Sequence, residues 1–328
     1  MTRQAIMGTY VLYEHVFGVN CPLSGRGPGG ANGATANGGG PMRPRRALVL
    51  PLVLAALAAT GSAHAAATAR VAALQVGLYS HGLYRGPIDG IAGPATRRAV
   101  RRLQLRARIA VDGVPGPQTR RALGRFGRHP FGSRPLRRGR IGWDVAALQF
   151  ELAAHGFPSG ALDGILGART DAALRRFQKW SAVRVDGVAG RGTFAALAAP
   201  PPRPTLRLSW PIQPASVGSP FGPRGDRFHS GIDLVAPKGT PVYAARGGKV
   251  VWADWAEGGW GFLVVVDHGD GERTWYAHLS RIDVRKGVWL DVGVRIGAVG
   301  ATGDATGPHL HFEVRVRGAS VDPLLALP

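Results

Sequence analysis

The stretch GPHLHFEV (Gly307–Val314) decides the fold of the C-terminal part of this 328-residue chain. Apolar residues alternate there with His309, His311 and Glu313, and a period of two is typical of a β-strand. Because residues i and i+2 of a strand point to the same side, the two histidines share one face, and the apolar face enters a core. The Gly-Pro pair before them is a turn signal that begins the strand.

Two further motifs in this part of the chain carry histidine or aspartate: FHSGIDL, with His229 and Asp233, and WYAHLS, with His278. Histidine and carboxylate side chains bind zinc and transfer protons near neutral pH. One His and one carboxylate from the first motif, with one His from the strand, make the three protein ligands of a catalytic zinc site. Each residue alone is more often structural, but their concentration in one domain favours a metalloenzyme.

The segments around these motifs, VYAARGGKVVWADW and WGFLVVVDHG, are rich in Val, Tyr and Trp and are interrupted by Gly. This composition predicts a β-rich, antiparallel domain. His268 adjoins the Gly-containing turn of a predicted hairpin, and we interpret it as structural. Trp260 is expected at the edge of a groove, and Arg224 is expected either to contact substrate or to form a salt bridge.

The middle of the chain contains one sequence unit twice, at an offset of 74 residues. VAALQ occurs at Val71–Gln75 and again at Val145–Gln149, and Asp-Gly and Thr positions recur behind each copy. Such internal repeats indicate duplicated structural units. Apolar residues at helical spacing predict three short helices in each unit, with Thr96 and its counterparts as N-cap residues.

On these motifs, residues 206–328 resemble the catalytic domain of the lysostaphin/LytM-type zinc metallopeptidases, which cleave peptide bonds in bacterial peptidoglycan. The family pattern of His-x-x-x-Asp, Tyr-x-His-Leu and His-x-His is complete, and SPFGPR and GIDLVAPKGTPVYA also match it. The resemblance implies that His229, Asp233 and His311 bind Zn²⁺.

The resemblance also implies that His278 and His309 line the catalytic water and the scissile carbonyl. Zinc lowers the pKa of a bound water from 15.7 to about 7. We interpret His309 as the general base, because it shares a strand face with His311. His278 would then stabilise the tetrahedral intermediate or protonate the leaving amine. These two roles could be exchanged, since the sequence does not separate them.

The two repeats resemble the peptidoglycan-binding repeat of many wall hydrolases, with a generic helical spacer as the alternative. Residues 66–204 hold 23 Lys/Arg and 7 Asp/Glu, whereas residues 205–328 hold 13 and 12. The excess positive charge of the repeat region suggests an anionic partner. We therefore expect peptidoglycan as the partner, with anionic wall polymers as a further class. No nucleic-acid partner is expected, because the sequence has no motif for one.

The sequence MRPRR (42–46), the apolar run over 47–59 and Ala63-His64-Ala65 together predict a secretory signal peptide. The apolar run is too short to span a membrane, so no membrane span is expected after cleavage. We interpret Met42 as the start and residues 1–41 as a gene-start artefact or a disordered extension. The only cysteine, Cys21, lies in that extension.

These features predict a multidomain α+β protein in which two small three-helix modules precede a β-rich antiparallel-sheet metallopeptidase domain. The expected parts are the extension (1–41), the signal peptide (42–65), repeat 1 (70–125), a basic linker (126–142), repeat 2 (143–198), a Pro-rich linker (199–205) and the peptidase domain (206–328).

We expect a secreted, monomeric zinc endopeptidase of the cell wall, periplasmic if the host has an outer membrane, that cuts stem peptides or cross-bridges. The alternatives are a non-catalytic wall-binding protein or activator of other wall hydrolases, and a zinc hydrolase of another amide. The sequence does not say which bond is cut.

Overall fold

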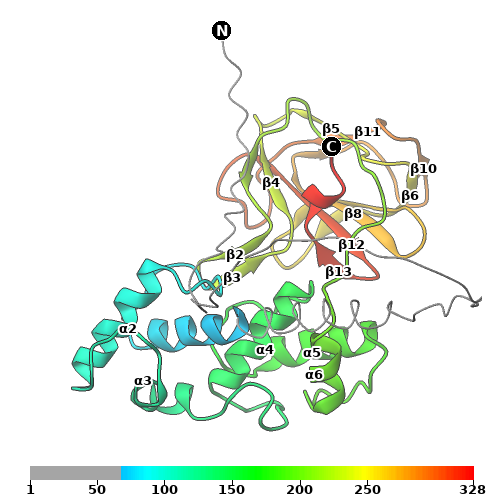
Figure 1. Ribbon diagram of the computed structural model, residues 1–328. Helices are drawn as coiled ribbons and strands as arrows, with labels where there is room; N and C mark the ends of the chain where they lie inside the picture. Colours follow the sequence, from blue (N-terminus) through cyan, green and yellow to red (C-terminus); the bar gives the residue numbers. More distant parts are fainter. Residues whose placement is uncertain (1–67) are drawn as a thin grey trace, which may run out of the picture. The chain divides into compact units, whose positions relative to one another are not determined.

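A computed structural model describes residues 68–328 (Figure 1). The predicted extension, the predicted signal peptide and Cys21 lie outside the described residues. The described residues form helices first (cyan to green) and strands afterwards (yellow to red), which confirms the expected α+β order. Within residues 68–328, no helix combines the length and apolarity needed to cross a membrane.

The helical part contains a three-helix unit twice. The first copy consists of a helix described over residues 68–80, α2 (Pro94–Arg106) and α3 (Pro117–Ala122), followed by the 3-10 turn η1 (Gly124–Gly127). The second copy consists of α4 (Trp143–Ala154), α5 (Ala168–Trp180) and α6 (Arg191–Leu197). Trp143 and Phe150 of α4 belong to the same hydrophobic cluster as Leu78 and Leu103, so the two copies share buried surface.

Each three-helix unit contains two buried glutamines, and each glutamine is hydrogen-bonded to an Asp-Gly turn and a threonine. The Gln149 side-chain amide donates to the Asp163 carboxylate (2.8 Å) and the Thr170 hydroxyl (3.1 Å), and its carbonyl accepts from the Gly164 N–H (2.8 Å). The same arrangement recurs around Gln75, Gln104 and Gln178. Each Asp-Gly turn is therefore tied to a helix by a satisfied buried polar network.

The predicted N-cap role of Thr96 is wrong. The N-cap residue of α2 is Gly93, which supplies no side-chain hydrogen bond, and Thr96 is buried in the first turn. Its hydroxyl donates to the Ile91 carbonyl (3.1 Å) and accepts from the Gln75 amide (3.2 Å). The hydroxyl serves the glutamine network because a buried amide N–H needs an acceptor.

The C-terminal part is built on an antiparallel sheet in the order β1-β4-β12-β8-β7-β6-β10, with β13 beside β12. Its strands are β1 (Val217–Ser219), β4 (Ile232–Val235), β6 (Gly248–Ala256), β7 (Gly261–Asp267), β8 (Glu272–Leu279), β10 (Trp289–Leu290), β12 (His309–Val316) and β13 (Ala319–Val321). A second sheet holds β5 (Pro241–Tyr243), β9 (Arg281–Ile282) and β11 (Arg295–Ala298), and a hairpin joins β2 (Gly222–Arg224) to β3 (Arg227–His229). The 3-10 turn η2 (Pro323–Leu325) follows β13.

The two faces of β12 differ as the alternation predicts. Leu310, Phe312 and Val314 are fully buried in the main core of this domain, together with Ile232 and Leu234 of β4. The other face carries the two histidines. Burial of the apolar face thus fixes which side chains point away from the core.

Truncation of Gln149 should destabilise the second repeat, because it leaves the buried Gly164 N–H without its acceptor and the Thr170 hydroxyl without a donor. For Gln149→Ala, we expect the free energy of unfolding to fall by about 2–3 kcal/mol. Urea unfolding followed by circular dichroism measures this change. The matched control is Gln118→Ala, at an exposed position of α3, which should shift stability by less than about 0.5 kcal/mol. Equal losses in both variants would contradict the structural role of the network.

Candidate functional site

Asp233 and His311 face each other across the β4–β12 pair. The Asp233 Oδ1 atom lies 2.8 Å from His311 Nδ1. His229, the last residue of β3, brings its Nε2 atom to 3.0 Å from the same carboxylate oxygen and 3.1 Å from His311 Nδ1. Three residues from three strands therefore form one compact cluster that could hold a metal ion.

The turn between β3 and β4 brings His229 to this cluster. A Cβ atom at Gly231 would lie 2.4 Å from the Phe312 carbonyl oxygen, so only glycine lets the backbone pass this close to β12.

The N–H groups of the two imidazoles point away from the centre of this cluster, which favours the binding of a cation there. His229 Nδ1 lies 2.8 Å from the Pro220 carbonyl oxygen and donates to it, and His311 Nε2 lies 3.2 Å from the Glu313 carboxylate. With the N–H groups directed there, His229 Nε2, His311 Nδ1 and Asp233 Oδ1 turn three lone pairs toward one point. Their separations approach the distance of about 3.3 Å between ligand atoms of a tetrahedral zinc ion. The residues present therefore fit a metal ion.

The charges around the cluster act in the same direction. Burial lowers the pKa of His311, but hydrogen bonds with Asp233 and Glu313 outweigh burial and raise it to about 9. Burial raises the pKa of the Asp233 carboxyl, yet the hydrogen bonds from His229 and His311 hold it well below its usual range. The site thus stabilises positive charge, and a metal ion would displace the proton that His311 otherwise takes up.

Glu313 is a functional residue that the sequence reasoning missed. It is fully buried, accepts from the Ser230 hydroxyl and lies 2.7 Å from the Arg315 Nε donor. Burial raises its pKa, but Arg315 and His311 lower it to about 2, so the carboxylate stays ionised. Such a carboxylate orients a ligating imidazole and fixes its tautomer. The signal was available, because Glu313 follows His311 by two residues and shares its strand face.

His278 reaches the site through an irregularity in β8. Regular alternation would put it on the same side as Tyr276, which is fully buried in the core. Instead, the φ angle of His278 is +60°, and the β7–β8 register shifts between Phe262 and Val264. A bulge of this kind redirects a side chain, and left-handed backbone at a non-glycine residue marks functional sites.

The two histidines outside the ligand cluster lie side by side, with ring centroids 4.8 Å apart. His278 Nδ1 donates to the Thr302 carbonyl and His309 Nδ1 to the Gly307 carbonyl, both at 2.8 Å. Both Nε2 atoms therefore remain proton acceptors. Burial, aided by the charges of His311 and His309, lowers the pKa of His278, so its imidazole is neutral at pH 7.

All five predicted site residues line one groove of about 500 Å³. Trp260 lines it too, as predicted, with its ring centroid 5.5 Å from that of His311. Arg224 forms an ion pair with Asp233 (3.0 Å), which is one of its two predicted roles. His268 is structural, as predicted: it donates to the Gly247 carbonyl (2.9 Å) and accepts from the Thr274 hydroxyl (2.8 Å).

Comparison with known families assigns both parts of the chain. The description "Peptidase family M23" matches residues 227–323, and "Putative peptidoglycan binding domain" matches residues 68–123 and 142–197. These matches confirm the predicted family and the two predicted binding repeats.

The individual relatives are similar over the peptidase region. The DD-carboxypeptidase/endopeptidase Mpg of Neisseria meningitidis serogroup B is 42% identical over 125 residues, which are 36% of this chain and 29% of that protein. The peptidoglycan DD-endopeptidase ShyA of Vibrio cholerae is 46% identical over 101 residues, 30% of this chain and 23% of that protein. The chain thus spans less than a third of the length of these curated relatives. Among solved structures, the antimicrobial peptidase lysostaphin from Staphylococcus simulans is 37% identical, with 34% of this chain and 48% of that chain covered and a TM-score of 0.32.

Neutralising Glu313 should weaken metal binding, because His311 loses the carboxylate that orients it. For Glu313→Gln, we expect the dissociation constant for Zn²⁺ to rise about 10–100-fold. Competition against a chromophoric chelator measures this constant. Glu272→Gln is the matched control: Glu272 is equally buried but accepts from Thr205 instead. Unchanged zinc affinity in the Glu313 variant would refute the orienting role.

Proposed function

We propose that the protein is a zinc-dependent endopeptidase that hydrolyses peptide bonds in peptidoglycan. Residues 227–323 match peptidase family M23, and two putative peptidoglycan-binding domains precede them in the chain. One observation carries the proposal. Three lone pairs converge in a groove where two further imidazoles have no hydrogen bond from their Nε2 atoms within residues 68–328. This arrangement combines a metal site with groups that move protons, as amide hydrolysis requires.

We assign His229, Asp233 and His311 as the metal ligands, with Glu313 orienting His311. When bound, zinc supplies a Lewis acid for the scissile carbonyl and lowers the pKa of a bound water. Three protein ligands leave a fourth position open, which is the arrangement of catalytic zinc sites.

The proton transfers are assigned to His309 and His278. We propose that His309 Nε2 takes the proton of the attacking water, because the Gly307 carbonyl holds the other ring nitrogen as a donor. His278, whose ring centroid lies 4.8 Å from that of His309, then takes up this proton at Nε2 and passes it to the nitrogen of the leaving amine as the C–N bond breaks. A neutral His278 also leaves the groove without a second imidazolium beside the substrate. The two histidines could exchange these roles, since both have the same tautomer.

The substrate and location follow from the relatives and the repeats. Relatives named DD-carboxypeptidase/endopeptidase and peptidoglycan DD-endopeptidase support stem peptides or cross-bridges of peptidoglycan as the substrate. We propose that the protein is secreted, acts at the cell wall as a monomer, and is held there by its two repeats. Tethering a catalytic domain to weak binding modules raises its effective concentration at the wall.

Hydrolysis should depend on the bound metal. Purified peptidoglycan incubated with the protein should gain new amine termini, identified by mass spectrometry of the released fragments. The gain should disappear after chelation and return with added Zn²⁺. Intact peptidoglycan that still binds the protein would instead support a non-catalytic wall-binding protein or an activator, and cleavage of unrelated amides alone would support a different hydrolase.

Removal of His309 should separate chemistry from metal binding. We expect His309→Ala to lower kcat by about 10²–10⁴-fold, the usual contribution of a general base, while zinc stays bound. Turnover of soluble cross-linked muropeptides and metal content are measured on the same sample. His81→Ala in the first repeat is the matched control and should keep full turnover. Full activity of zinc-loaded His309→Ala would contradict the assignment of His309 as the general base.

A further inference from the structure

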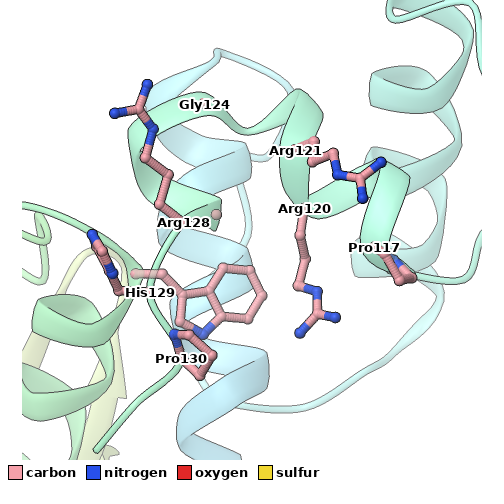
Figure 2. Close-up of a pocket in the computed structure, with 9 residues that line it drawn as sticks. Pro117, Arg120, Arg121, Gly124, Arg128, His129 and Pro130 are labelled. Carbon is pink, nitrogen blue, oxygen red and sulfur yellow. The ribbon is translucent and has the colours of Figure 1, made fainter. Parts of the chain in front are cut away.

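A basic cavity that the peptidase mechanism does not use lies between α3 of the first repeat, the segment that follows it and the start of α4. It has a volume of about 460 Å³ and is lined by Arg120, Arg121, Arg128 and His129, with Trp143 and two prolines (Figure 2). None of its nine lining residues is acidic. Figure 2 shows the arginines around its rim: Arg120 and Arg121 come from α3, and Arg128 follows η1.

The charges of this cavity are not neutralised within the described residues. Over residues 68–328, no ion pair within 4.0 Å involves any of its three arginines. The nearby Asp144 is already paired with Arg134, at 2.7 Å. Three arginines around one cavity make its surface positive, which would attract an anionic ligand.

The second repeat shows that the fold itself does not require these arginines. At the offset of 74 residues, Phe194 and Ala195 of α6 replace Arg120 and Arg121, and Pro202 replaces Arg128. Phe194 packs edge-on against Phe131, with ring centroids 5.2 Å apart. The equivalent helix face thus contributes to a core in one copy and carries unpaired positive charge in the other.

We propose that this cavity, which we call the arginine cavity, binds the carboxylate-bearing stem peptide of peptidoglycan. The proposal rests on the proposed function for its choice of polymer. A planar guanidinium matches a planar carboxylate through two parallel hydrogen bonds. Pro117 and Pro130 offer apolar surface to the aliphatic parts of a short peptide. The volume lies in the range of small-ligand pockets, about 300–1,000 Å³.

Other anionic polymers fit the arginine cavity less well. Single-stranded nucleic acid is held by aromatic rings on which bases stack, whereas the one aromatic ring here, Trp143, is only 7% exposed. A phosphate-bearing wall polymer would use the charges but not the apolar wall of the cavity. A stem peptide uses both, because carboxylates and aliphatic side chains alternate along it.

Calorimetric titration of the full chain at physiological ionic strength tests this assignment. The ligand is a monomeric disaccharide–tetrapeptide muropeptide, titrated in the presence of a metal chelator so that the proposed reaction cannot cleave its stem peptide. We expect the combined Arg120→Gln, Arg121→Gln and Arg128→Gln variant to raise its dissociation constant at least about tenfold, as the loss of charged hydrogen bonds predicts. The same muropeptide with amidated carboxyl groups should bind the unaltered protein equally weakly.

The matched control removes the same charge from the same repeat. Arg98, Arg102 and Arg106 are exposed on α2 and lie outside the arginine cavity, and their combined change to Gln should alter the dissociation constant less than about twofold. Thermal unfolding checks that both variants are folded, and Arg120→Gln alone serves if the triple variant is not.

Three results would overturn the assignment: equal weakening in the α2 control, which indicates diffuse attraction; undiminished binding of the amidated muropeptide; or tighter binding of a phosphate-bearing wall polymer through the same arginines. Hydrolysis is measured separately on the unaltered protein. Hydrolysis without binding at the arginine cavity would refute only this binding site. Binding without hydrolysis would refute only the proposed reaction.

Discussion

The antiparallel pairing of β4 with β12 is the constraint on which the site depends. It sets Asp233 opposite His311 on one face while Ile232, Leu234 and Phe312 enter the core on the other. A slip by one residue would turn the ligands into the core and the apolar side chains into the groove. The hydrophobic effect therefore fixes the register, and the register fixes the distance between the Asp233 carboxylate and the His311 ring. Precise polar geometry is obtained here from an apolar pattern.

Much of this site could be predicted from the sequence, because local pattern determines local geometry. The strand that follows Gly307-Pro308 and the face shared by His309 and His311 follow from alternation alone. The orientation of His278 does not, since a bulge set by pairing with β7 reverses the side that alternation assigns. The spacing of Glu313 from His311 places both on one strand face, but the burial of Glu313 depends on neighbouring strands that the local sequence does not specify.

The helical repeats illustrate a different limit of sequence reasoning. The 74-residue repeat and its helices were visible, but the role of glutamine was not, because Gln149 meets Asp163 and Thr170 only after the chain has folded back. The N-cap prediction for Thr96 is wrong for the same reason, because its hydrogen-bond partner, Gln75, is 21 residues away. Four such networks hold the turns independently of the surface residues. The surfaces of the two copies are therefore free to differ, as they do at α3 and α6.

The backbone N–H of His278 donates to the Trp260 carbonyl at 3.0 Å, in the loop that closes one side of the groove. The wall of the groove and the imidazole that we propose to act on the substrate are thus mechanically linked. Insertions or replacements in this loop would alter turnover together with selectivity, so the two properties could not diverge independently during evolution.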